Sequence, residues 1–312
     1  MIELLRAVFV APFADMVGNP TFLVEVLIGG IAAGLMYSLV ALGFVLIFKA
    51  SGVFNFAQGV MVLFAALTLV GLMEKGVPVP IALTLTVVVM IALAFAIERA
   101  VLRPLVNQAP IILFMATIGL NFFLEGFGEM VWGANVKKLD IGIPDTSFTV
   151  RGVQMNRLEL TAALTAAVMV AVLAVFFQRT RIGRALRAVA DDHEAALSIG
   201  IPLKTIWVVV WSVAGLVAIV AGIMWGAKSG VQFSLSLIAL KALPVLILGG
   251  FTSVPGAIAG GLIIGVGEKL GEVYWGPLVG GAIENWFAYV LALTFLLFRP
   301  QGLFGEKIIE RV

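Results

Sequence analysis

A succession of long apolar runs constrains the fold of this chain more than any other feature. Several runs reach the roughly 20 residues that a helix needs to cross the hydrocarbon core of a bilayer. The runs are 22–48, 53–73, 78–98, 110–131, 158–178, 206–227, 235–250, 256–275 and 281–298. We therefore predict an all-α, polytopic membrane helical bundle with about 8–9 transmembrane helices, built as a single transmembrane domain over residues 1–312.

The composition agrees with this class and excludes several others. Apolar residues make up 62% of the chain and charged residues 12%, about half of the roughly 25% charged residues in soluble proteins. The chain has no cysteine, which excludes disulfides and thiolate metal sites, and its single histidine, His193, cannot form a metal site alone. No basic patch alternates with aromatic residues, so we expect membrane lipid and no nucleic acid as a partner. We also expect no catalytic residues and no cofactor.

Two stretches interrupt the apolar pattern. Residues 49–60 and 241–257 are short, Gly-rich or broken, and each is predicted to form a broken or re-entrant helix. Irregular backbone of this kind occurs at membrane depth only where it is buried in protein or lines a polar cavity. We therefore expect both stretches to lie inside the bundle.

The polar segments predict the topology. Residues 1–20 are predicted to lie at the membrane interface, and residues 132–157 to form a polar outer loop with short strands. If the basic loop at 179–205 is cytoplasmic, the inner segments hold eleven of the 20 Lys and Arg residues and six of the 18 acids. This distribution agrees with the positive-inside rule. The N-terminus is then outside and the C-terminal tail, residues 299–312, is inside.

The basic loop has the pattern of a charged helix of about 15–18 residues. Thr180 can cap its N-terminus, and Gly200 stands where the end of a helix favours a left-handed residue. Pro202 prevents the helix from continuing. The periodicity leaves two interpretations open: a helix that docks a soluble partner, and a solvated loop whose basic residues only fix the topology.

Sequence motifs in and around this loop resemble a known family. Glu194-Ala195-Ala196 followed by Gly200 resembles the EAA…G coupling loop of ABC importer permeases. The run Arg-Thr-Arg-Ile-Gly-Arg-Ala-Leu-Arg-Ala-Val-Ala-Asp-Asp at 179–192 resembles the LivH-type permeases of branched-chain amino acid importers. Agreement extends to Gly34-Leu-Met-Tyr-Ser-Leu-Val-Ala-Leu-Gly43, Phe54-Asn-Phe-Ala-Gln-Gly59, Thr117-Ile-Gly-Leu120, the glycine-rich stretch 248–261 and Phe298-Arg-Pro-Gln-Gly-Leu-Phe-Gly305. The resemblance covers nearly the whole chain from about position 25, and it identifies the family better than the substrate.

The resemblance implies a permease subunit of the bacterial inner membrane that moves branched-chain or other hydrophobic amino acids by ATP-driven alternating access. It makes 132–157 a periplasmic loop, 179–205 a cytoplasmic coupling loop and 299–312 a cytoplasmic tail. It implies two ATP-binding cassette subunits, a second homologous permease (LivM-like) or a second copy of this chain, and a periplasmic substrate-binding protein. The chain has no Gly-x-x-x-x-Gly-Lys-Ser/Thr motif of its own, so ATP hydrolysis is expected in the partners. The residues expected to couple to the ATPase are Arg184, Arg187, Asp191, Glu194, Ala195, Ala196 and Gly200.

Two alternatives to this function remain. A urea or short-amide ABC permease would share the same type of subunit. A secondary transporter or channel that works alone would need an ion-coupling site, and the sequence shows no convincing pair of buried acids for one.

Polar residues inside the apolar runs are candidates for the translocation path, because such residues are costly at membrane depth. Asn55 and Gln58 lie in the interrupted stretch, and Thr117 and Asn121 are one helical turn apart. The alternative is structural: Asn55 and Gln58 satisfy local backbone groups, and Thr117 and Asn121 bond between helices. Lys241 is expected near the outer interface, where its aliphatic stem lets the ammonium reach water.

Glycines four residues apart predict close packing between helices, because lipid supplies no hydrophobic drive for association. The pairs are Gly30–Gly34, Gly222–Gly226, Gly256–Gly260, Gly261–Gly265 and Gly267–Gly271. Ordinary bundle packing is the favoured interpretation, and packing that lets helices slide during transport is the alternative.

Overall fold

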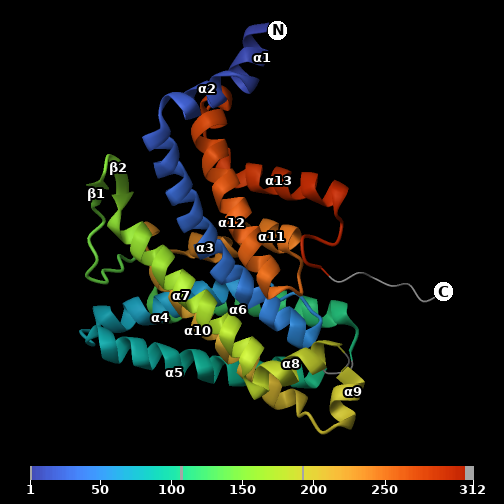
Figure 1. Ribbon diagram of the computed structural model, residues 1–312. Coiled ribbons are helices and arrows are strands. Elements are labelled where there is room, and N and C mark those ends of the chain that lie inside the picture. The colour runs from blue at the N-terminus through green and yellow to red at the C-terminus, as the bar shows by residue number, and fades with distance from the viewer. Residues whose placement is uncertain (1, 106–107, 192, 306–312) are drawn as a thin grey trace, which may run out of the picture.

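The computed structural model describes residues 2–105, 108–191 and 193–305, and it forms a bundle of helices with one small hairpin (Figure 1). In this part of the chain, six helical segments are long and apolar enough to cross a membrane. They contain α3 (Pro20–Ser51), α5 (Val79–Ile97), α6 (Pro110–Trp132), α7 (Arg157–Arg179), α10 (Leu203–Ser229) and α12 (Val254–Leu270). The prediction of a helical, polytopic membrane protein is therefore confirmed.

Three of the nine predicted spans form shorter helices. They are α4 (Gln58–Glu74), α11 (Ile238–Gly249) and α13 (Glu284–Phe298). At 17, 12 and 15 residues they fall short of the roughly 20 that a full crossing requires. The predicted number of 8–9 crossings is therefore not reached by helix length, because irregular backbone replaces part of each apolar run.

The remaining elements are short. Two helices, α1 (Ile2–Phe9) and α2 (Ala11–Gly18), precede the bundle, and two more, α8 (Arg181–Asp191) and α9 (His193–Ser198), fill the basic loop. Single turns of π- or 3-10 helix are η1 (Glu98–Leu102), η2 (Arg103–Leu105), η3 (Phe233–Leu237), η4 (Gly271–Trp275) and η5 (Gly276–Val279).

An antiparallel hairpin is the exception to the all-α prediction. Strands β1 (Ser147–Val150) and β2 (Val153–Asn156) pair with Ser147 opposite Asn156. Arg151 and Gly152 join them, and both have positive φ, as the tightest hairpin turns require. The short strands expected in the loop at 132–157 are thus present.

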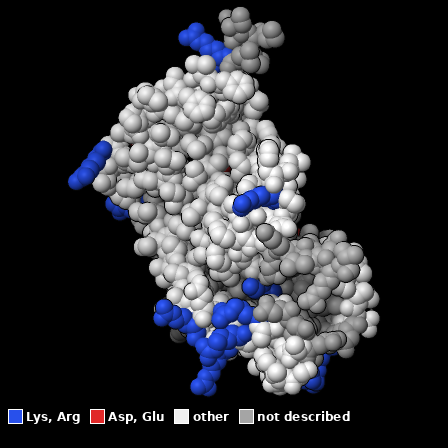
Figure 2. All heavy atoms as spheres, turned by 45° about the vertical axis from the view of Figure 1, so that its right-hand side comes forward, with Lys and Arg blue, Asp and Glu red and all other residues white. Residues whose placement is uncertain are grey.

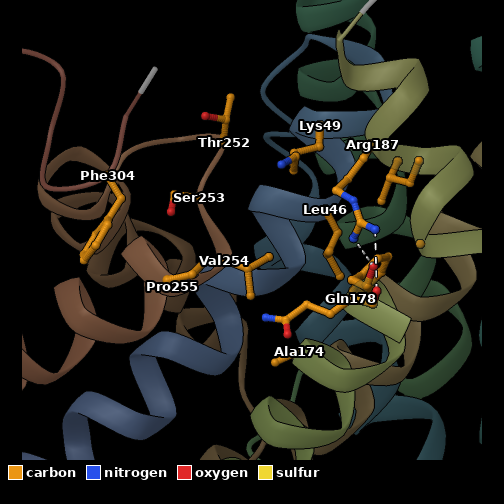
Figure 3. Close-up of a pocket in the computed structure, with 13 residues that line it drawn as sticks. Leu46, Lys49, Ala174, Gln178, Arg187, Thr252, Ser253, Val254, Pro255 and Phe304 are labelled. Carbon is orange, nitrogen blue, oxygen red and sulfur yellow. Dashed lines mark hydrogen bonds between the residues drawn. The ribbon is translucent and has the colours of Figure 1, made fainter. Parts of the chain in front are cut away.

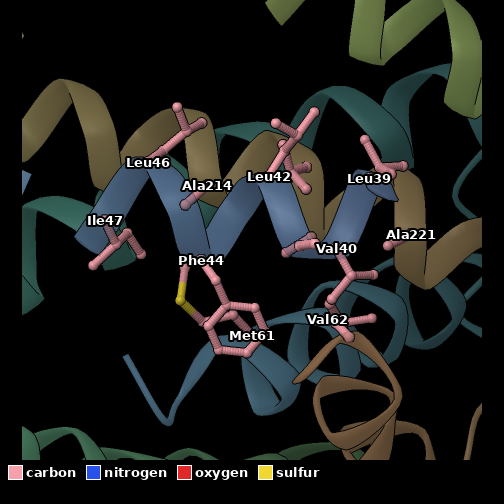
Figure 4. Close-up of a cluster of buried hydrophobic side chains, with 14 of the residues drawn as sticks. Leu39, Val40, Leu42, Phe44, Leu46, Ile47, Met61, Val62, Ala214 and Ala221 are labelled. Carbon is pink, nitrogen blue, oxygen red and sulfur yellow. The ribbon is translucent and has the colours of Figure 1, made fainter. Parts of the chain in front are cut away.

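Helix α3 lies at the centre of the bundle. It contacts α12, α10, α7 and α11, and its residues from Met36 to Ile47 are buried on every side. A helix that is apolar all round is expected to be enclosed by other helices. Figure 4 shows its Leu39, Val40, Leu42, Phe44, Leu46 and Ile47 among Met61 and Val62 of α4 and Ala214 and Ala221 of α10.

Glycines bring α3 and α12 into backbone contact. The two helices run antiparallel, with Gly30 against Val266 and Gly34 against Gly261. A Cβ added to Gly34 would lie 2.6 Å from the carbonyl oxygen of Gly261, and one on Gly265 would lie 2.3 Å from the nitrogen of Gly34. The close packing predicted from these glycine pairs is confirmed, because no larger side chain fits between the backbones.

The bundle has two distinct ends. At one end, which we name the basic end, the indole N–H of Trp207 donates to the carbonyl of Ala50 (3.0 Å) and joins the start of α10 to the end of α3. Helix α8 packs on the ends of α3 and α7 there. Figure 2 shows Lys and Arg gathered near the bottom of the molecule, the level at which α8 lies in Figure 1. At the other end, the hairpin end, the backbone N–H of Gln154 donates to Glu25 of α3.

Candidate functional site

The chain turns back on itself between α3 and α4. After Gly52, which ends α3 with φ +69°, residues 53–57 return along the helix. The ring of Phe54 stacks on that of Phe44 at 4.7 Å between centroids. Helix α4 therefore starts beside the middle of α3. The predicted break at 49–60 is confirmed, whereas in the second stretch the irregular backbone is confined to residues 250–253, between α11 and α12.

A different irregular segment, η3, lies against this break. The Cα of Gly59 at the start of α4 lies so close to η3 that an added Cβ would be 2.0 Å from the carbonyl oxygen of Ser236. Irregular backbone from two distant parts of the chain thus adjoins at this point, with residues 53–57 buried or half-buried and Leu237 of η3 exposed.

Three of the four predicted path residues are buried and bonded to backbone. The side-chain oxygen of Asn55 accepts from the N–H of Ala57 (3.1 Å), and the hydroxyl of Thr117 accepts from the N–H of Phe56 (3.0 Å). The amide nitrogen of Gln58 lies 3.5 Å from the carbonyl of Ala214, and its side-chain oxygen has no hydrogen-bond partner. Asn55 and Gln58 are 0% exposed and Thr117 is 3% exposed. Asn55 and Thr117 therefore hold the irregular segment in place, and Gln58 links the start of α4 to α10.

The fourth path residue, Asn121, lines a cavity of about 240 Å³ beside the break. Its wall is mainly apolar, and Glu125 one turn further along α6 adds a charge. The aromatic and aliphatic lining residues come from both irregular segments and from helices α3, α6 and α11: Phe44, Phe54, Phe56, Phe122, Leu237, Leu240 and Leu243. An apolar cavity of this kind suits a hydrophobic side chain.

The basic loop forms helices α8 and α9 on either side of residue 192, which lies outside the described residues, and the start of α8 and the end of α9 are capped. The hydroxyl of Thr180 accepts from the N–H of Gly183 (3.0 Å), as predicted for an N-cap. Gly200 has φ +84°, and Ile201 donates back to the carbonyl of Ala196 (3.0 Å), which is the predicted C-terminal arrangement. The apolar face of α8 is buried through Leu186 and Val189.

Arg187 ties α8 to the end of α7. Its guanidinium donates to the carbonyl oxygens of Phe177 (2.5 Å) and Gln178 (3.5 Å), as Figure 3 shows. It lines a cavity of about 270 Å³ between α8 and the start of α12, together with Lys49 and Ser253. Because the last carbonyls of a helix lack internal partners, this arginine satisfies α7 as well as presenting charge.

The other predicted coupling residues are placed as follows. Arg184 and Ala195 are exposed, and Ala196 is buried at 1% exposure. The side chains of Asp191 and Glu194 lie outside the described residues, although their backbones belong to α8 and α9.

A charged cluster near the hairpin end was missed by sequence reasoning. The ammonium of Lys241 lies 3.4 Å from Glu268 and 3.2 Å from Glu284, and the hydroxyl of Tyr37 donates to Glu268 (2.8 Å). Lys241 near the outer interface stays a prediction, and the structure adds that two carboxylates hold its ammonium while its side chain is 25% exposed. The weak signal was the presence of two acids, Glu268 and Glu284, within predicted membrane spans.

Comparison with known proteins identifies the family. Residues 26–299 match the family described as "Branched-chain amino acid transport system / permease component". The chain belongs to this family. The permease is 28% identical to the high-affinity branched-chain amino acid transport system permease protein BraD of Pseudomonas aeruginosa, over 92% of this chain and 97% of that protein.

A second relative carries the same description. The permease is 27% identical to LivH of Escherichia coli, named with the same transport system, over 93% of this chain and 98% of that protein. A solved structure, PsaBC from Streptococcus pneumoniae in complex with Fab, aligns with 92% of this chain and 94% of that chain at 15% identity and a TM-score of 0.47.

Proposed function

We propose that this permease translocates branched-chain or other hydrophobic amino acids across the bacterial inner membrane by ATP-driven alternating access. The observation that carries the proposal is the family match over nearly the whole chain, joined to relatives named for branched-chain amino acid transport. Two ATP-binding cassette subunits supply the energy, a second permease (a LivM-like subunit or a second copy) completes the pathway, and a periplasmic protein delivers the substrate.

The basic end faces the cytoplasm in this proposal. Lys49, Arg99, Arg184 and Arg187 belong to segments that meet at this end, and the positive-inside rule assigns such segments to the cytoplasm. The N-terminus is then outside and the C-terminus inside.

Helices α8 and α9 receive the ATPase. The exposed Arg184 and Ala195 offer a docking surface, and Arg187 transmits a displacement of α8 to α7 through two carbonyls. Buried contacts of α8 extend the connection to α3 and α10. Coupling requires that the ATP-bound and ATP-free partners bind the two permease states with different affinities.

The substrate side chain passes the apolar cavity beside the break between α3 and α4. Asn121 and Glu125 supply its polar groups, and irregular backbone borders it. Asn55 and Thr117 keep that backbone in its conformation, Gln58 ties the adjoining start of α4 to α10, and all three act on the path indirectly.

A matched pair of variants tests the coupling. Gly200→Arg places a charged side chain at the docking surface, and Gly142→Arg does the same in the loop at the opposite end. Both glycines have positive φ (+84° and +76°) and nothing within 4 Å of an added Cβ, so both substitutions cost about 1–2 kcal/mol of backbone strain.

We expect Gly200→Arg, and likewise Glu194→Lys, to abolish ATP-dependent leucine uptake in proteoliposomes while the permease remains inserted. Gly142→Arg should keep uptake. Normal uptake by either Gly200→Arg or Glu194→Lys would contradict the proposal.

A further inference from the structure

The charged cluster lies in the wall of a separate cavity of about 300 Å³, on the side of the bundle nearer the hairpin. Six helices contribute to its lining: α3, α7, α10, α11, α12 and α13. Its volume is at the small end of the roughly 300–1,000 Å³ of ligand pockets in proteins, so it suits a solute of the size of one amino acid.

The charges of this cavity balance. Three lysines and three glutamates line it: Lys228, Lys241, Lys269, Glu159, Glu268 and Glu284. A site for a lone cation would carry an excess of acids, and a site for a lone anion an excess of bases. Separate cationic and anionic groups with no net charge match a zwitterion.

The ion pairs differ in the distance between their charged atoms. Lys228 and Glu159 are 2.7 Å apart, a normal distance for a charge-assisted bond of about 2.7–2.9 Å. Lys241 is shared between Glu268 and Glu284 at 3.4 and 3.2 Å. Its ammonium is therefore not fully engaged with either carboxylate, and an incoming carboxylate and ammonium can each compete for a partner.

The two carboxylates have different surroundings. Glu268 is 3% exposed and accepts the hydroxyl of Tyr37, whereas Glu284 is 38% exposed. Glu268 is therefore fixed, and it holds Lys241 in position. Glu284 is the acid that can release Lys241 and turn to a ligand.

An apolar wall faces the charges. Ala32, Ala33 and Met36 of α3 line the cavity, and Trp225 stacks on Tyr37 at 5.9 Å between ring centroids. A ligand held by both charged groups would therefore have its side chain beside small and aromatic residues. A neutral polar solute such as urea would gain little from the ions that dominate this cavity.

Stability alone does not account for the cluster. Charged groups among membrane helices are costly, and a buried ion pair is often no more stabilising than apolar residues of similar volume. A ligand that uses the charges supplies a physical reason for their presence.

We propose that this cavity is a binding site for the main-chain ammonium and carboxylate of a free α-amino acid, entered from the hairpin end. Lys241 receives the carboxylate, Glu284 receives the ammonium, and Glu268 with Tyr37 positions Lys241. This inference rests on the proposed function, because it names where that permease first holds its substrate.

Equilibrium binding of radiolabelled L-leucine tests the site, with the permease and its ATPase subunits purified together in nanodiscs and the periplasmic binding protein omitted. We expect saturable binding in the millimolar range or below. Lys241→Met should weaken leucine binding at least about ten-fold, because removing one member of a buried charge pair costs affinity. Lys138→Met, an exposed lysine outside the cavity at the same end, should leave it unchanged.

A second ligand separates recognition from a structural role. L-leucinamide keeps the ammonium and side chain but lacks the carboxylate, so Lys241→Met should weaken its binding much less than that of leucine. Glu284→Gln, which keeps the shape of the side chain, should weaken both ligands.

Unsaturable leucine binding to the native complex, or unchanged binding to Lys241→Met and Glu284→Gln, would overturn the inference. Equal loss of leucine and leucinamide in Lys241→Met would do so as well. If Lys241→Met does not fold, Glu284→Gln alone decides. Association of the native permease with ATPase subunits during purification tests the proposed function separately, so the two failures are distinguishable.

Discussion

The contact between α3 and α12 predicts a sharp difference between two glycines of the same helix. Gly34→Ala puts a methyl group 2.6 Å from the carbonyl oxygen of Gly261 and 2.9 Å from the Cα of Leu262. Gly29→Ala puts one where no atom lies within 4 Å. Both substitutions change helix propensity equally, so their difference isolates the packing.

The magnitude follows from the distances. The shorter contact of Gly34→Ala is 0.8 Å below the 3.4 Å at which ordinary contact begins. The obstacle is backbone on both sides, so the helices must separate rather than a side chain rotate. Overpacking of this kind costs about 1–3 kcal/mol, whereas Gly29→Ala should be neutral or slightly stabilising.

Thermal unfolding of the purified permease in detergent, followed by tryptophan fluorescence, measures the difference. We expect a lower unfolding temperature for Gly34→Ala than for Gly29→Ala. Equal unfolding temperatures for the two variants would refute the close approach of α3 and α12.

Two further substitutions follow from the buried and capping contacts. Asn55→Leu should lower the free energy of unfolding by about 1–3 kcal/mol, because it leaves the buried N–H of Ala57 without its acceptor. Gln58→Met should lower the free energy of unfolding by less, since the side-chain oxygen of Gln58 has no partner. Chemical unfolding of both variants measures the difference. Arg187→Met should lower stability by about 1 kcal/mol and reduce ATP-dependent uptake, because it removes the link between α8 and α7. Arg181 is exposed on the same helix, so Arg181→Met should change stability little. Thermal unfolding and uptake assays compare the two variants.

The helices could be predicted from the sequence because each apolar run carries its own signal. Pro20 and Pro110 begin α3 and α6, and Gly52 and Gly200 end helices in the left-handed conformation. These are local effects of ring geometry and of a missing Cβ. These local effects do not depend on contacts with the rest of the chain.

The lengths of α4, α11 and α13 could not be predicted in the same way. The sequence predicts the break at 49–60, but hydropathy does not give the extent of irregular backbone, because residues 53–57 and 233–237 are mainly apolar. Whether such residues form a helix or irregular backbone depends on partners elsewhere, such as Thr117, which bonds to the N–H of Phe56.

The charged cavity could not be predicted from the sequence either. Tyr37, Lys241, Glu268 and Glu284 are separated by up to 247 positions, and each has an ordinary explanation when taken alone. Only the packing of α3, α11, α12 and α13 brings them together. Likewise, nothing in the spacing of Arg187 indicates that it bonds to carbonyls at the end of the preceding helix.

The docking of ATPase subunits on α8 at a cytoplasmic basic end is the central claim, and thiol labelling tests it most directly. The chain has no cysteine, so Arg184→Cys and Lys138→Cys each carry a single thiol, at opposite ends of the bundle. With a membrane-impermeant maleimide, we expect Arg184→Cys to react only from the cytoplasmic side and to be protected by bound ATPase subunits, and Lys138→Cys to react only from outside. Labelling of Arg184→Cys from outside, or labelling that bound ATPase subunits leave unchanged, would contradict the account.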